Sequence, residues 1–236
     1  MSKGNAGGGL RRFYIIFAIV ALMGIAVLGY AVGRKALGRA ATMPVDLEGT
    51  TDLRRLTELA VPISNGNPDA PATIIVFGDF LCNHCAAFSL RIRPLVESTF
   101  VETGQARLLF YDFPLNPETG TFLAARAARC AGDQGRYWEY HDQLYRAQIT
   151  WGVQRDKVAV FREYADQLGL DAGDFRSCLN SDRHAAEVSA NREMANALGL
   201  GGTPSVLVGS GSGMSRRLPD YAFETIRDAV QAILGG

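Results

Sequence analysis

The chain has no surplus of charge of either sign and few residues that bind metals. Its 236 residues include 24 basic and 24 acidic side chains, so the formal net charge is zero. Without a basic surplus there is no electrostatic footprint for a nucleic-acid partner. There are only four cysteines and three histidines, and Cys82 and Cys85 are the only closely spaced cysteine pair. Structural zinc sites usually take four ligands from two close pairs, so the composition offers little for such a site.

One long segment lacks charge altogether. Residues 13–32 contain no charged side chain, and Tyr14 and Tyr30 lie near the two ends, where amphipathic rings favour a membrane interface. A helix of this length, at about 1.5 Å per residue, spans about 30 Å, the thickness of the hydrocarbon core of a bilayer. A cleaved signal peptide has a shorter apolar stretch of about 7–15 residues. We therefore expect an uncleaved transmembrane signal anchor over residues 13–33, with cleavage near Ala40-Ala41 as the alternative.

The direction of this anchor is indicated by chain length and cysteine usage. Basic residues flank the apolar run equally on both sides, so the positive-inside rule gives no orientation. Only residues 1–12 precede the run, whereas most of the chain and all four cysteines follow it. An even number of cysteines in an exported chain suggests disulfides in an oxidising compartment. We expect a single-pass protein of the cell membrane, with a cytoplasmic tail over residues 1–12 and the C-terminal domain outside the cytoplasm.

Beyond the apolar run the chain divides into a tether and one folded domain. Residues 34–56 mix charges with Gly, Thr and Pro and show no sustained apolar period, which predicts a linker. The domain, residues 57–236, alternates strand-like and helix-like segments. Strands are predicted at 74–77, 107–113 and 205–208, and helices at 82–101, through most of 119–198 and at 219–234. This order predicts an α/β fold with a large helical insertion over about residues 117–199.

The most informative motif is Cys82-Asn83-His84-Cys85, which follows the first predicted strand and opens the next helix. Two thiols so spaced can close a small disulfide ring, and the helix dipole favours a thiolate there. This placement lowers a thiol pKa from about 8.5 to about 3.5–7.5. We predict that Cys82 is the exposed nucleophile and Cys85 the shielded resolving thiol. The imidazole of His84 is expected to stabilise the thiolate and make the disulfide more oxidising. A zinc site and an inert disulfide are the alternatives.

A second motif, Gly202-Thr203-Pro204, precedes the third predicted strand. Taken alone it is compatible with a simple loop stop, because X-Pro bonds are cis in only about 5–6% of cases in folded proteins. The interpretation as a cis-proline is favoured when the motif is combined with the C-x-x-C motif upstream.

Together these motifs resemble the DsbA-like thiol–disulfide oxidoreductases of the thioredoxin fold, specifically the membrane-tethered bacterial members. The segments that carry the resemblance follow the expected order within about residues 58–236: 69–74, 77–85, 128–131, 134–142 and 202–204. The resemblance implies a thioredoxin-like fold and no organic cofactor. It also implies a cis bond before Pro204, beside the active-site disulfide, and a Thr203 whose backbone groups bind the substrate chain and which tunes the thiol.

Two positions depart from the pattern of that family. The residue after the first cysteine is often proline there and is Asn83 here. Six residues before the first cysteine the relatives commonly carry a buried acid, which relays a proton to or from the resolving thiol, and this chain has Val76. The first change leaves the redox potential open. The second leaves water or another side chain to serve Cys85.

The remaining cysteines, Cys130 and Cys178, both lie in the helical block. By themselves they are compatible with buried free thiols that pack as small apolar groups. Some relatives have a second disulfide that pins the insertion, so the resemblance and an oxidising location imply a structural Cys130–Cys178 disulfide. The aromatic residues over 137–151 are expected to pack in the core. His141 and His184 are expected to be structural or surface residues, and no metal site is predicted.

The sequence and the resemblance lead to one functional hypothesis and two rivals. We expect an extracytoplasmic thiol–disulfide oxidoreductase that introduces disulfides into exported proteins with free thiols. The candidate catalytic residues are Cys82, Asn83, His84 and Cys85, and the candidate substrate-binding residues are Thr203 and Pro204. The resemblance implies reoxidation by a quinone-linked integral membrane partner. The rivals are a disulfide reductase or isomerase of the same fold, and a non-catalytic, membrane-tethered factor for metal delivery or assembly.

Overall fold

The computed structural model describes residues 14–26, 41–47, 52–210 and 215–235. The chain divides into two units, residues 1–39 and 40–236. In the first unit residues 14–26 are helical and their side chains are exposed. Among the described residues, no helix has both the length and the apolar character needed to cross a bilayer. The predicted anchor over 13–33 extends past this helix at both ends, and those ends lie outside the described residues.

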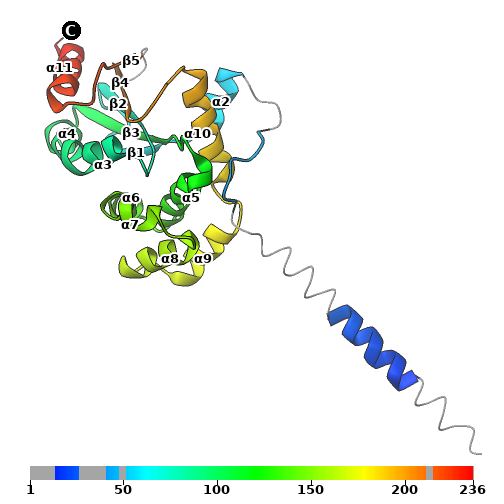
Figure 1. Ribbon diagram of the computed structural model, residues 1–236. Coiled ribbons are helices and arrows are strands. Elements are labelled where there is room, and N and C mark those ends of the chain that lie inside the picture. The colour runs from blue at the N-terminus through cyan, green and yellow to red at the C-terminus, as the bar shows by residue number, and fades with distance from the viewer. Residues whose placement is uncertain (1–13, 27–40, 48–51, 211–214, 236) are drawn as a thin grey trace, which may run out of the picture. The chain divides into compact units, whose positions relative to one another are not determined.

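The second unit is built around a five-stranded mixed sheet (Figure 1). Its strands are β1 (Ile63–Asn65), β2 (Ala72–Gly78), β3 (Ala106–Asp112), β4 (Ser205–Ser210) and β5 (Arg216–Arg217), in the order β1-β3-β2-β4-β5. β2 and β3 run parallel, and the other neighbouring pairs are antiparallel. Nearly every residue of the central β2 is buried, as its continuous apolar sequence predicts. The three predicted strands are confirmed, whereas β1 and β5 have only 3 and 2 residues and give no recognisable period.

Helices cover both faces of the sheet. On one face α2 (Leu53–Leu59) packs against α10 (Ala185–Ala197), over a core cluster that includes Phe77 (Figure 1). On the other face α11 (Phe223–Leu234) contacts β2 and β4, over a larger cluster that includes Val76. Consecutive strand residues point to opposite faces, which is why Val76 and Phe77 belong to different clusters.

The helix that opens with the C-x-x-C motif changes its hydrogen bonding along its length. α3 (Asn83–Ala87) passes into the π-helical η1 (Phe88–Ile92), then α4 (Arg93–Val96) and the π-helical η2 (Glu97–Val101). In η1 the Arg93 N–H donates to the Phe88 carbonyl, one residue further back than in an α-helix. A proline within a helix lacks an N–H and crowds the preceding turn, and the wider π turn before Pro94 accommodates it. The predicted helix over 82–101 is confirmed.

The interval between β3 and β4 is almost entirely helical, as predicted. After the short η3 (Pro117–Thr119) it holds α5 (Thr121–Gly132), α6 (Tyr137–Arg146), α7 (Gln148–Gly152), α8 (Lys157–Gln167), α9 (Ala172–Asn180) and α10 (Figure 1). α5 is buried along nearly its whole length, since its many alanines let other elements approach closely on every side. It contacts α6, α8, α9 and α10 and is therefore the centre of the insertion.

Residues 41–47 pack on the domain and are not part of a free tether. Arg126 in α5 donates from Nη1 to the Ala41 carbonyl at 2.6 Å. The Val45 N–H donates to Ser189 Oγ in α10 at 2.9 Å. α2 also begins inside the predicted linker, at Leu53. Ala41, Val45 and Leu47 also pack against the core clusters. The domain thus starts earlier than predicted, because backbone groups and so few apolar side chains leave no apolar period in the sequence.

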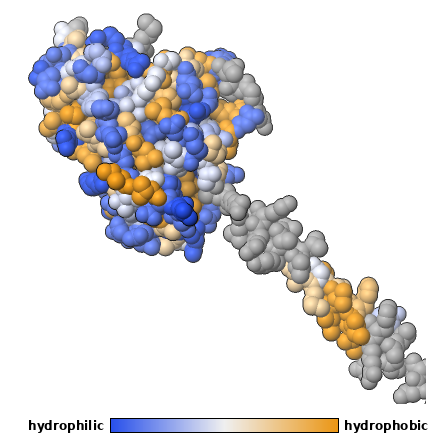
Figure 2. Space-filling view, viewed as in Figure 1, coloured by the Kyte–Doolittle hydropathy of each residue, from blue (hydrophilic) through white to orange (hydrophobic). Residues whose placement is uncertain are grey.

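The visible surface of the domain intersperses hydrophilic and hydrophobic residues, whereas the helix over 14–26 is largely hydrophobic (Figure 2). The last helix begins at Phe223, later than predicted, because Asp220 caps a turn ahead of it by accepting the Ala222 N–H at 2.9 Å.

Candidate active site

The two thiols of the C-x-x-C motif lie where β2 ends and α3 begins, and both are free. Cys82 is the N-cap of α3, with extended backbone angles (φ −79°, ψ 119°), and its Sγ accepts the Cys85 N–H at 3.3 Å. The Cys82 N–H in turn donates to the Asp79 carbonyl at 3.1 Å, which closes the turn between strand and helix. A thiol at a helix cap lies among N–H groups that have no partner within the helix, and these favour its anion.

Cys82 is the more acidic of the two thiols. Its pKa is lowered to about 5, chiefly by a hydrogen bond from the Cys85 thiol, while partial burial opposes the shift. Backbone N–H groups of Cys85 and His84 add to the lowering. When protonated, Sγ donates to the Thr203 carbonyl oxygen at 3.2 Å. The thiolate is the nucleophilic form, so most Cys82 is in the form that can attack a disulfide at neutral pH.

Cys85 differs from Cys82 in both exposure and protonation. Its side chain is buried, at 2% relative exposure. Burial raises its pKa well above the usual value, and the neighbouring Cys82 raises it further. At neutral pH the pair is therefore a thiolate at Cys82 that accepts a hydrogen bond from a thiol at Cys85. This arrangement, with an accessible first sulfur and a shielded second one, is the one predicted from the motif.

The second motif reaches the same place from the start of β4, the antiparallel neighbour of β2. The peptide bond between Thr203 and Pro204 is cis, as the resemblance implied. The Thr203 carbonyl contacts Cys82 Sγ, and its Oγ1 is buried without a hydrogen-bond partner in the described part of the chain. The Thr203 side chain contributes to lowering the pKa of both cysteines, as a hydroxyl donor to a sulfur anion does. Thr203 therefore presents both an acceptor and a donor to the dithiol.

The two residues between the cysteines face solvent. Asn83 is the first residue of α3 and is exposed. His84 is also exposed, and its Nδ1 lies 2.8 Å from the Tyr221 hydroxyl, just before α11. Through its backbone N–H His84 helps to lower the Cys82 pKa. Its ring is engaged with Tyr221, so a direct effect of the imidazole on the thiolate stays a prediction.

Asp79 is a functional candidate that the sequence reasoning missed. Its side chain is buried, and its carboxylate accepts the Leu81 N–H at 2.6 Å and the Leu115 N–H at 2.8 Å. Burial raises its pKa, with these two hydrogen bonds opposing, and the Cys82 charge raises it further. Val76, at the position where relatives commonly carry a buried acid, lies in the apolar core. The signal for Asp79 was an Asp just after a buried strand, where its side chain can bond to backbone N–H groups of the following turn.

The aromatic-rich stretch packs in the core, as expected. The ring of His141 is fully buried among aromatic side chains: Phe80, Phe110, Tyr137, Trp138 and Tyr145. Burial lowers its pKa to about 4, although the Asp142 carboxylate opposes this from 2.9 Å. A neutral His141 therefore supports the floor of the site, because Phe80 is two residues from Cys82 and contacts the ring.

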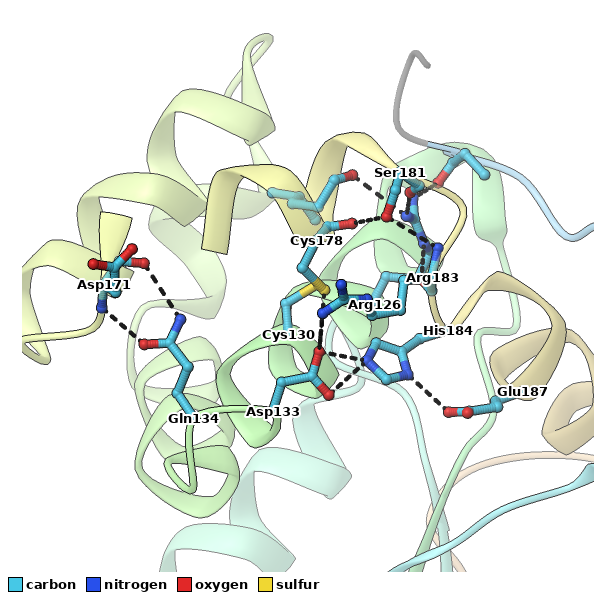
Figure 3. The surroundings of a disulfide bond; sticks show 12 residues. Arg126, Cys130, Asp133, Gln134, Asp171, Cys178, Ser181, Arg183, His184 and Glu187 are labelled. Atoms are coloured by element: carbon cyan, nitrogen blue, oxygen red, sulfur yellow. Dashed lines mark hydrogen bonds and ion pairs between the residues drawn. A yellow bond between two sulfur atoms is a disulfide. The ribbon is translucent and has the colours of Figure 1, made fainter. Parts of the chain in front are cut away.

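The other cysteine pair forms a disulfide within the insertion, as expected (Figure 3). Cys130 in α5 and Cys178 in α9 have Cα atoms 5.8 Å apart, and both residues are buried. Cys178, Asp133 and His184 also form a group whose geometry could hold a metal ion. No sequence motif predicts this group, since its members come from three separate elements. The prediction that His184 takes part in no metal motif is therefore not supported by its surroundings.

A dithiol on a thioredoxin-like sheet beside a cis-proline defines a class of proteins, the thiol–disulfide oxidoreductases of DsbA type. Residues 59–217 match the thioredoxin family, and the chain belongs to it. The "Probable disulfide bond formation protein D" of Bacillus anthracis is 25% identical over 172 residues, covering 71% of this chain and 76% of that protein. A "Na(+)/H(+) antiporter NhaA 1" of Salinispora arenicola is 30% identical over 188 residues, covering 77% of this chain. The match spans only 27% of the antiporter's own length.

Solved structures confirm the fold. Wolbachia pipientis α-DsbA1 superposes with a TM-score of 0.65 at 20% identity, covering 75% of this chain and 95% of that structure. Oxidised BdbD from Bacillus subtilis gives a TM-score of 0.65 at 20% identity, covering 73% and 92%. With the sequence relatives, they confirm the resemblance to DsbA-like thiol–disulfide oxidoreductases.

Proposed function

We propose that this protein is an extracytoplasmic thiol–disulfide oxidoreductase that introduces disulfides into exported proteins. The observation that carries the proposal is the asymmetry of the dithiol, with an accessible Cys82 of pKa about 5 above a buried Cys85 thiol. A thiol of low pKa leaves readily from a mixed disulfide, and a stabilised thiolate makes the corresponding disulfide a strong oxidant. Both effects favour transfer of the disulfide to a substrate.

The reaction begins with the oxidised Cys82–Cys85 form. A substrate thiolate attacks Cys82 Sγ, a mixed disulfide forms, and Cys85 leaves as a thiolate that takes up a proton. The second substrate thiolate then attacks the substrate sulfur of the mixed disulfide and releases the Cys82 thiolate. Two electrons pass to the enzyme, and the substrate leaves with one new disulfide. The Thr203 carbonyl and the cis-Pro204 lie where an extended substrate chain can align beside Cys82.

The electron partner and the location follow the same proposal. Reoxidation by a quinone-linked integral membrane protein is implied by the family resemblance. Anchoring in the membrane is supported by the uncharged run over residues 13–32, of which 14–26 are helical. Labelling Cys82 in intact, mildly reduced cells with a membrane-impermeant thiol reagent tests the location. Labelling that occurs only after lysis contradicts it.

The direction of electron flow is tested by the reduction potential of the purified chain. We expect a value nearer the roughly −120 mV of strong oxidants than the roughly −270 mV of thioredoxin. Oxidation of a reduced, unfolded dithiol protein by the purified chain is the accompanying assay. A thioredoxin-like potential would assign the chain to the reductases or isomerases.

A further inference from the structure

Outside the active site, side chains of the types that bind metals lie around the second disulfide (Figure 3). One ligand atom each from Asp133, Cys178 and His184 all lie within 4.8 Å of one another. Asp133 Oδ2 is 3.6 Å from Cys178 Sγ, and both its oxygens are 3.1 Å from His184 Nε2. In a tetrahedral zinc site with bonds of about 2.0–2.3 Å, neighbouring ligand atoms are about 3.3–3.8 Å apart. The cluster is therefore close to the size of such a site.

The orientation of His184 is that of a histidine ligand. Its Nδ1 lies 2.9 Å from Glu187 Oε2, and the same oxygen accepts from Arg129 Nη1 at 3.0 Å. A metal-bound histidine almost always donates its other ring N–H to a carboxylate, carbonyl or water, which fixes the ring. Figure 3 shows the imidazole between the Asp133 and Glu187 carboxylates. With Nδ1 held by Glu187, Nε2 points at Asp133, where an ion would lie.

The backbone of His184 is also unusual. Its φ of 65° lies in the left-handed region, and it is the only residue other than glycine with a positive φ in the described part of the chain. Such conformations are uncommon for residues with side chains and concentrate at functional sites. In this conformation His184 precedes α10 and its ring faces Asp133 at the end of α5.

In the oxidised chain the two sulfurs bond to each other and leave no thiolate for a metal. A dithiol reductant changes this by giving two electrons and two protons to the Cys130–Cys178 disulfide and becoming a disulfide itself. Zinc can then displace both protons and bind the two thiolates. Cys130 and Cys178 thereby complete a set of four ligands with Asp133 and His184, all of types that zinc prefers.

We propose that reduction of the Cys130–Cys178 disulfide creates a zinc site formed by these two cysteines, Asp133 and His184, with Glu187 orienting the histidine. The disulfide joins α5 to α9, and the ion in its place would join both helices to the start of α10 through His184. A pocket of about 280 Å³, lined by both cysteines and Asp133, gives the ion a route of entry. Arg183, whose Nη1 now lies 2.9 Å from Asp133 Oδ2, has a half-exposed side chain and can turn to solvent when the ion binds.

Zinc binding by the full chain tests this site, in a Cys82→Ser/Cys85→Ser background that removes the other dithiol. The chain is reduced with a phosphine, freed of reductant without air, and titrated with Zn²⁺ against a chromophoric chelator. We expect one tightly bound zinc per reduced chain and none in the oxidised chain. Co²⁺ in place of zinc is expected to give a thiolate-to-metal charge-transfer band.

Substitutions separate this site from adventitious binding. His184→Ala should abolish tight binding, and Glu187→Gln should weaken it about 10–100-fold, as loss of an orienting carboxylate does elsewhere. Asp174→Asn is the matched control, because Asp174 lines the same pocket but is not a ligand. Circular dichroism of each oxidised variant checks that it folds, since the disulfide is intact there.

Three results would overturn the proposal: no zinc on the reduced chain, equal binding by the oxidised chain, or affinity that His184→Ala and Glu187→Gln leave unchanged. None of them bears on the activity assigned to Cys82, which does not take part.

Discussion

The two cysteine pairs of this chain share a chemistry and have opposite surroundings. Cys82 is partly exposed at a helix cap, where N–H groups and the Cys85 thiol stabilise its anion. Cys178 is buried and bonded to Cys130, so it presents no thiolate and its sulfur is shielded from attack. Exchange needs an accessible thiolate, whereas a crosslink lasts longest where attack is blocked. Stabilisation of the thiolate and exposure thus distinguish an exchange-active cysteine pair from a structural disulfide within one fold.

The strongest test of this difference between the two pairs is to remove one sulfur from the exposed pair. Cys82→Ser should abolish disulfide exchange, because a serine hydroxyl neither ionises near neutral pH nor forms a mixed disulfide. The assay is oxidation of a reduced, unfolded protein by the purified chain. Cys130→Ser/Cys178→Ser, measured at a temperature where it is folded, is the control and should retain most activity. Full activity in Cys82→Ser would show that this pair is not the redox centre.

A second test concerns the pH dependence of the exposed thiol. Alkylation of Cys82 in the reduced chain should reach half its maximal rate near pH 5. Because folding lowers this pKa from 9.0, the thiolate stabilises the folded reduced chain fully above pH 9, and the contribution is lost as pH falls through about 5. Cys85→Ala removes the largest cause and should raise the midpoint by more than one pH unit. An unmoved midpoint would assign the shift to the helix cap instead.

Removal of the buried pair should act on stability. Cys130→Ala/Cys178→Ala opens a crosslink between residues separated by 48 positions, and the chain-entropy model gives a loss of about 4 kcal/mol. Chemical denaturation of the oxidised chains measures the free energy of unfolding. Cys82→Ala/Cys85→Ala removes a disulfide that closes a far smaller loop, so it should change the free energy of unfolding much less. Equal losses of unfolding free energy in the two double variants would show that Cys130–Cys178 is not a specifically structural disulfide.

The carboxylate beside the exposed pair offers a smaller effect. Asp79→Asn keeps the shape of the side chain but places an NH₂ group against one of two backbone N–H donors, from Leu81 and Leu115. The expected cost is about 1–3 kcal/mol of unfolding free energy. Asp69→Asn, the same change at an exposed turn, should stay within about 0.5 kcal/mol. If both variants unfold alike, the Asp79 carboxylate does not hold the turn before Cys82.

The smallest expected effect lies at the rim of the active site. Tyr221→Phe removes one exposed hydrogen bond, to His84 Nδ1, and should cost less than about 1 kcal/mol of stability. The reduction potential should move by less than about 20 mV, the equivalent of 1 kcal/mol for two electrons. Titration against a glutathione buffer measures it. A larger shift would mean that Tyr221 controls the thiolate through the His84 ring.

Local patterns in the sequence were sufficient for the centre of the fold. β2, the C-x-x-C turn and the helix after it are each encoded within a few consecutive residues, so their positions were predicted correctly. Asp79 was not predicted as a buried carboxylate, because the relatives carry their acid at the position of Val76. Buried carboxylates are recognised from their partners, and the partner Leu115 lies far along the chain.

Other features depend on contacts that no local pattern encodes. The group of Asp133, Cys178 and His184 is assembled from the ends of α5, α9 and α10, and only packing brings these residues together. Residues 41–47 bind through backbone groups and a few apolar side chains, and their lack of an apolar period suggested a tether. The strand β5 is held by pairing with β4 and not by any propensity of its own.

A pulling force on the N-terminal side of the domain is transmitted to α5 through Arg126, which binds the Ala41 carbonyl. This side chain is fully buried, and its guanidinium donates to four backbone carbonyl groups: Ala41, Leu179, Ser181 and Arg183. A pull at Ala41 is therefore passed from α5 to the end of α9, the two helices that the Cys130–Cys178 bond joins. The turn that carries Cys82 takes no part in these contacts.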